Sequence, residues 1–163
     1  MIHRACMAAF FAAVFLAGFG AVPVARAADY GDLRIVTVTR DFKDVAQDVA
    51  DAIVNRGLVI DHRGYIGKML KRTGQAAGGG KAIYTQAQYF QFCSALFSRR
   101  MMEADPRNIG YCPFVIVVYE LAAKKGTVHV GFRRPPQAGS DASRKALAAV
   151  DTLLRGIVKD ATE

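Results

Sequence analysis

The sequence has no tryptophan, only three cysteines and only three glutamates among its 163 residues. The glutamates do not occur in pairs, and the Gly-x-Ser-x-Gly motif of serine hydrolases is absent. The cysteines and histidines lack the Cys-x-x-Cys, His-x-x-x-His and Cys-x-x-Cys-His spacings. The glycine-rich stretch 73–80 lacks the spacing to a Lys-Ser/Thr pair that a phosphate-binding loop needs. We therefore assign no catalytic residue, no metal site and no cofactor, and the sequence favours a protein that is not an enzyme.

Residues 1–27 have the pattern of a secretory signal peptide. A basic start precedes an almost uncharged apolar run at residues 7–24, and residues 25–27, Ala-Arg-Ala, form the small-x-small motif of a signal peptidase site. We expect cleavage after Ala27 and a periplasmic or secreted protein with no membrane attachment afterwards. The alternative is a retained membrane anchor, because the apolar run is close to the length that crosses a bilayer. Pro23 and the cleavage motif argue against the anchor.

The remaining residues, 28–163, have the length of one domain. Without Arg4 and Arg26 they carry 20 basic and 14 acidic residues, a net charge of +6. The basic residues are scattered in pairs and are not interleaved with aromatic residues, so we do not expect nucleic-acid binding. A moderately basic exported domain can meet anionic surfaces or ligands. The expected partner is therefore an unidentified protein or a small anionic ligand.

The pattern of apolar residues predicts an α+β fold with a single antiparallel sheet and helices on one face. Asp41 is expected to cap a long helix that ends near Gly57. The run Phe114–Tyr119 is apolar on both faces, which predicts a central strand covered on both sides or in contact with a second copy, and hence a homodimer. Other strands are expected at 33–40, 58–63, 82–92 and 127–133, short helices at 65–72 and 94–103, and a final helix after Ser140 or Asp141.

A family resemblance rests on four segments. The run DFKDVAQDVADAIVNRGLVIDHRGYIGKML is followed by Phe92-Cys93, by Asp105-Pro106, and by Cys112-Pro113 leading into FVIVVYE. Together they resemble the bacterial and archaeal Domain of Unknown Function 302 family over roughly Leu33 to Arg134. The resemblance implies a compact TATA-binding-protein-like fold in the order strand, helix, four strands, helix, often dimeric. It supplies no reaction, which leaves a binding or accessory protein of unknown ligand as the expected function.

Cys93 and Cys112 are the two cysteines that the exported chain would keep. In an oxidising compartment, such a pair most often forms a structural disulfide. The competing interpretation is a thiol/disulfide redox pair. Cys93 is expected near a helix N-terminus with Arg99 and Arg100 close by, and both features lower the pKa of a thiol. The sequence leaves these two interpretations open.

Two histidines give a third interpretation, in which His62 and His129 join the cysteines in a metal or haem site. His62 is expected on the same strand face as Leu58 and Ile60, as a packed residue or as a ligand at the rim of a pocket. His129 is expected at a solvated position of the sheet. Glu120 ends the central strand and could face a pocket or water. The candidate ligand-binding residues are His62, Arg99, Arg100, Tyr119 and Glu120.

Overall fold

The computed structural model describes residues 25–163, so the expected signal peptide lies outside the described residues except for its last three positions. Six strands form one antiparallel sheet in the order β1-β2-β6-β5-β4-β3. No helix within residues 25–163 is long and apolar enough to cross a membrane. The strands are β1 (Arg26–Tyr30), β2 (Leu33–Val38), β3 (Val59–Gly64), β4 (Tyr84–Cys93), β5 (Phe114–Leu121) and β6 (Val128–Arg133). The helices are α1 (Phe42–Val54), α2 (Ile66–Thr73), α3 (Ala95–Ala104), the 3-10 helix η1 (Pro106–Tyr111) and α4 (Asp141–Thr162).

Helix α1 begins and ends where the sequence predicts. The Asp41 carboxylate accepts hydrogen bonds from the backbone N–H groups of Lys43 (2.7 Å) and Asp44 (3.4 Å), which satisfies donors that the first turn leaves unpaired. Asn55 is the C-cap, and Gly57 follows with φ of +72°, a conformation that glycine adopts without the steric cost of a Cβ.

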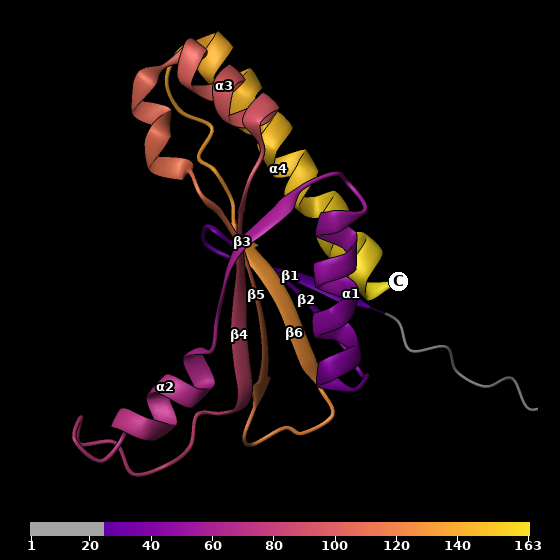
Figure 1. Cartoon of the computed structure of the whole chain (residues 1–163), viewed down its shortest axis with the longest axis vertical. Coiled ribbons are helices and arrows are strands. Elements are labelled where there is room, and N and C mark those ends of the chain that lie inside the picture. The colour runs from indigo at the N-terminus through magenta and orange to yellow at the C-terminus, as the bar shows by residue number, and fades with distance from the viewer. Residues whose placement is uncertain (1–24) are drawn as a thin grey trace, which may run out of the picture.

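The hydrophobic core lies between one face of the sheet and helices α1 and α4 (Figure 1). We call this face the helix side and the opposite face the open side. Along β5, Ile116 and Val118 are fully buried on the helix side, whereas Val115 and Val117 on the open side are only half-buried. The central position of β5 between β4 and β6 is confirmed. Within the described chain, its open side lacks the complete cover that its apolar sequence predicts.

The α+β class with a single antiparallel sheet is confirmed, but two elements differ from expectation. Strand β1 was not expected: it is a short and polar segment whose five residues are all exposed and pair with β2. Cleavage after Ala27 would fall within this strand. Helix α2 carries Ile66, Met69 and Leu70 at helical spacing, as a core-facing helix would, yet no residue of this helix is buried. Helix α2 lies on the other side of the strands from α1 and α4 (Figure 1), so the helices do not all cover one face.

Candidate functional site

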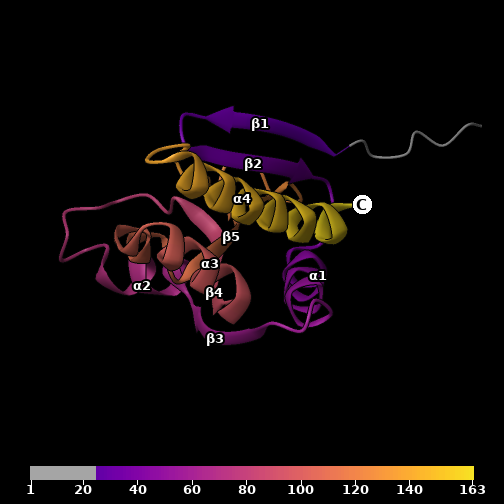
Figure 2. The same cartoon turned by 90° about the horizontal axis from the view of Figure 1, so that it is seen from above.

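The first half of β4 forms one wall of a cleft. Strand β3 pairs only with the second half of β4, from Gly64 opposite Tyr89 to Val59 opposite Cys93. Residues 84–88 of β4 therefore pair with β5 on one edge and with no described strand on the other. Helix α2 and the loop after it project away from the rest of the molecule here (Figures 1 and 2). A cleft of about 960 Å³ lies between the start of α1, α2 with its loop, and this part of β4.

Positive charge gathers around this cleft, which we call the basic cleft. Its lining includes five cationic side chains and no carboxylate. All five are exposed, and none takes part in an ion pair among the residues that the structure describes. Unpaired charges of one sign around a concave surface create a potential that attracts the opposite charge. The five cations are Lys43 of α1, Arg63 of β3, Lys68 and Lys71 of α2, and Lys81 of the loop.

Two of these cations rest on aromatic rings. The guanidinium carbon of Arg63 lies 5.0 Å from the centre of the Phe90 ring, and Nζ of Lys68 lies 4.6 Å from the centre of the Tyr65 ring. Both distances are within the range of cation–π attraction. These contacts orient the two side chains while leaving their N–H groups without a carboxylate partner in the described chain. The arrangement is therefore suited to accepting an anion from solution.

A second cavity, of about 380 Å³, lies on the open side of the sheet. Tyr30, Tyr84 and Tyr119 line it together with aliphatic side chains, and we call it the tyrosine pocket. The rings of Tyr84 and Tyr119 meet edge to face, with centres 5.6 Å apart. Burial raises the pKa of Tyr119, with smaller contributions from Tyr84 and Tyr30. This volume is within the range of small-molecule sites.

His129 supports the wall of the tyrosine pocket. Its ring stacks on Tyr119 with centres 4.7 Å apart, and its Nδ1 lies 2.9 Å from Oγ1 of Thr37. Its Nε2 is buried and has no hydrogen-bond partner among the described residues. Burial, followed by the charge of Lys124, lowers the pKa of His129. The expectation of a solvated His129 was therefore wrong, because the neighbouring Tyr119 ring covers it.

The structure brings Cys93 and Cys112 together. Their Sγ atoms are 2.9 Å apart and unbonded, and Oγ of Ser98 lies 3.3 Å from Sγ of Cys112. Cys93 ends β4 and Cys112 precedes β5, so the pair stands at the base of the segment 94–111. Burial, the adjacent Cys112 and the charge of Asp61 raise the pKa of Cys93 to about 12. The lowered pKa expected from the sequence was therefore wrong.

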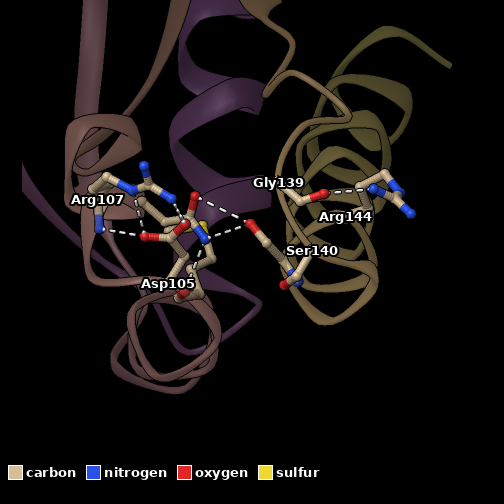
Figure 3. Close-up of polar contacts among 8 residues, drawn as sticks. Asp105, Arg107, Gly139, Ser140 and Arg144 are labelled. Carbon is tan, nitrogen blue, oxygen red and sulfur yellow. Dashed lines mark hydrogen bonds and ion pairs between the residues drawn. The ribbon is translucent and has the colours of Figure 1, made fainter.

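Segment 94–111 is fixed to α4 by hydrogen bonds (Figure 3). The Asp105 carboxylate caps η1 by accepting hydrogen bonds from the backbone N–H of Arg107 (2.9 Å) and from its guanidinium (3.0 and 2.8 Å). The buried Asn108 donates from Nδ2 to the Met101 carbonyl and to Oγ of Ser143 on α4, each at 2.9 Å. These bonds hold the segment in place, which fixes the positions of the cysteines at its base.

The candidate ligand-binding residues do not form one site. Tyr119 lines the tyrosine pocket, whereas Arg99 and Arg100 are exposed on α3, where Arg99 pairs with Glu103 at 2.7 Å. Glu120 faces neither a pocket nor water. It is 7% exposed, and its Oε1 accepts a hydrogen bond from the Gly126 N–H at 2.6 Å, which closes the hairpin between β5 and β6.

His62 does not share a face with Ile60. A bulge between these two residues shifts the register, so that Ile60 pairs with Phe92 and His62 pairs with Gln91. Ile60 consequently packs against the core, while His62 faces Tyr89 on the open side with ring centres 5.8 Å apart. His62 and His129 do not join the cysteines, and within residues 25–163 no three His, Cys, Asp or Glu side chains gather as a metal-binding group.

The basic cleft has no signature in the sequence, because its cations come from four separate segments. Lys68 and Lys71 are three residues apart on α2, a spacing that places them on one helical face, and this was the one local signal available. Nothing in the sequence places Lys43 or Lys81 beside them. These segments come together because β3 ends at Gly64, opposite Tyr89, and because α2 projects from the sheet directly after it.

The fold is an α+β sandwich of one antiparallel sheet with two long helices on its helix side. The chain belongs to the family described as Domain of unknown function DUF302, which matches residues 34–161 and confirms the resemblance found in the sequence. The structure is similar to the crystal structure of an uncharacterized conserved protein DUF302 from Bacillus stearothermophilus. The TM-score is 0.66 at 14% identity, covering 81% of this chain and 99% of that chain, a likeness that shows the shared fold. No match was found among the curated proteins.

Proposed function

We propose that this chain is an exported binding protein and that its ligand is a small anion held in the basic cleft. The observation that supports the proposal is the set of five exposed cations around a 960 Å³ cleft whose lining contains no carboxylate. Ten other cations of the described chain, nine of them arginines, form ion pairs with carboxylates. The cations of the cleft lack such partners, so a bound anion would supply the missing charge.

The strength of this binding comes from several weak contacts. Each exposed ion pair contributes roughly 0.2–1 kcal/mol, so a single lysine would bind an anion poorly. Several cations acting on one polyvalent anion give a total of about 3–4 kcal/mol, which corresponds to a dissociation constant of about 1–10 mM. Since the charges are exposed, salt should weaken the binding.

The proposal is tested by calorimetric titration with citrate, a polyvalent carboxylate. The double variant Lys68→Glu/Lys71→Glu reverses two charges of the cleft, and it should bind citrate about tenfold more weakly, a change of about 1.4 kcal/mol. The matched control is Lys124→Glu/Lys125→Glu, which makes the same change in net charge on exposed residues of the β5–β6 turn, outside the lining of the cleft. Its affinity should be close to that of the original protein.

Two results would contradict the cleft as the site. An equal loss of affinity in both double variants would show attraction to the net charge of the whole protein. Unchanged affinity in Lys68→Glu/Lys71→Glu would place the anion elsewhere. Repeating the titration at higher salt checks the electrostatic origin, because attraction between exposed charges falls as the ionic strength rises.

Export and dimerisation form part of the proposal. Export is supported by the signal-peptide pattern of residues 1–27, and N-terminal sequencing of the native protein should find Ala28 first. Dimerisation is supported by the run Phe114–Tyr119, which is apolar on both faces and which leaves Val115 half-buried on the open side of β5. Sedimentation at micromolar concentration should show a dimer, and a monomer would contradict this part of the proposal.

A disulfide between Cys93 and Cys112 is the second candidate role, favoured by the 2.9 Å separation of their sulfur atoms. Its formation would join the two sulfurs and release two protons and two electrons, which a small-molecule disulfide could accept as it is reduced to two thiols. The raised pKa of Cys93 makes it a poor thiolate and a poor leaving group, which favours a lasting structural bond over a rapidly exchanging redox pair. Titration against glutathione separates these roles, because an easily reduced bond would favour redox function.

A further inference from the structure

Two cavities of opposite chemical character meet at β4. The basic cleft and the tyrosine pocket share the lining residues Tyr84, Ala87 and Gln88. Ala87 is buried, and the backbone of Gly67 packs so closely on it that a Cβ at Gly67 would lie 2.9 Å from the Ala87 nitrogen. This contact holds the start of α2 against β4. A ligand in the cleft and a ligand in the pocket would therefore contact the same residues of β4, Tyr84, Ala87 and Gln88.

Helix α2 contributes to both cavities with different residues. Ile66 lines the tyrosine pocket, whereas Lys68 and Lys71 line the basic cleft. The pocket lining contains no charged residue: aliphatic and tyrosine side chains make up most of it, with the amide of Gln88. A cavity of this composition favours the binding of apolar groups, whereas the basic cleft favours the binding of negatively charged groups.

Large apolar side chains are exposed at both cavities. Tyr65 and Ile83, which line the cleft, are 48% and 59% exposed, and Tyr30 at the pocket is 66% exposed. Large apolar side chains left in water near a cavity commonly mark a surface that a ligand covers. Here they lie beside cations, so the surface suits a molecule with an apolar part and a negative part.

We infer that the ligand is an amphipathic anion, with its acidic head in the basic cleft and its alkyl chain in the tyrosine pocket. The inference rests on the proposed anion site and names the class of molecule that occupies it. A fatty acid or a comparable single-chain carboxylate has this chemistry. The carboxylate would bind among Lys68, Lys71 and Lys81, and the chain would pass Tyr84 to reach Ile66 and Val117.

Calorimetric titration with citrate, octanoate and dodecanoate tests this assignment. Each buried methylene improves affinity by roughly fourfold, so four additional methylenes with partial burial should make dodecanoate bind at least tenfold more tightly than octanoate. Ile66→Gln places an amide in the pocket and should remove most of that gain while leaving citrate binding unchanged. The matched control is Ile109→Gln, since Ile109 on η1 is 62% exposed and lies away from both cavities.

The outcomes separate this inference from the proposed function. If dodecanoate binds no more tightly than octanoate while citrate still binds in the cleft, the amphipathic ligand is excluded and the anion site stands. If dodecanoate binds tightly and Lys68→Glu/Lys71→Glu has no effect on it, the head group is not in the cleft and the inference fails. Retained citrate binding and an unchanged melting temperature show that Ile66→Gln is folded. A second pocket variant, Val117→Gln, should also reduce the gain from chain length, and full retention of the gain in both variants would overturn the inference.

Discussion

Oxidation of Cys93 and Cys112 to a disulfide should stabilise the folded protein, and the number of residues between the two cysteines determines by how much. The two residues are 19 positions apart and close a loop that contains α3 and η1. In the chain-entropy description, a cross-link over about 20 residues removes enough freedom from the unfolded chain to contribute about 3 kcal/mol. The folded state needs little adjustment, because hydrogen bonds to α4 already hold the loop and the sulfurs are 2.9 Å apart.

The measurement is thermal unfolding followed by circular dichroism. For a domain of this size, about 3 kcal/mol corresponds to a rise of about 10 °C in melting temperature. The oxidised protein should melt about 10 °C above both the reduced protein and Cys93→Ser/Cys112→Ser. Ser98→Ala is the control, since it removes the 3.3 Å contact with Cys112 and leaves the cysteine pair intact. Equal melting of the oxidised protein and the double variant, or two alkylatable thiols in protein isolated from its native host, would refute the reasoning.

Two further predictions concern titrating groups. Burial lowers the pKa of His129, so the folded state favours the neutral ring and the stability of the protein should fall as the pH drops below about 6.5. In an NMR titration, Lys124→Ala should raise this pKa because it removes a neighbouring positive charge. The control Lys125→Ala, which makes the same change in net charge, should change the pKa of His129 less. A normal or raised pKa at His129 would contradict its burial behind Tyr119. The hydrogen bonds from Arg107 lower the pKa of Asp105 to about 2, so its stabilising contribution should be present above about pH 4 and lost as the pH falls through about 2. Arg107→Ala should raise this pKa toward 3.8, and an unchanged titration of Asp105 would show that Arg107 is not the cause.

The parts of the fold that follow from local pattern were predictable. The Asp41 cap and the end of α1 near Gly57 each depend on residues close together in the sequence, and the structure confirms them. Strand β1 was not predictable, because its five exposed and mostly polar residues carry no alternation and are held by pairing with β2. The bulge in β3 also leaves no local signal, and it moved His62 to the other face.

The site was less predictable than the fold because it depends on where strands end. The cysteines could be paired on the basis of compartment and number, and the structure brings them together. The basic cleft instead forms because β3 ends opposite Tyr89 and α2 projects away from the sheet. The pattern of apolar residues in a helix or strand specifies neither feature. Glu120 illustrates the opposite error: a carboxylate near the end of a central strand suggested a ligand site, and it binds the backbone of its own hairpin.

The central claim is that an anion binds in the basic cleft, and an NMR titration that maps backbone amide shifts tests it most directly. Addition of citrate should shift amides of residues 65–71 on α2 and 81–88 at the start of β4, together with those near Lys43. Amides of α3, η1 and the second half of α4 should stay unchanged, because these elements do not line the cleft. Shifts concentrated on α3 around Arg99 and Arg100, or spread evenly over all basic surfaces, would contradict the account.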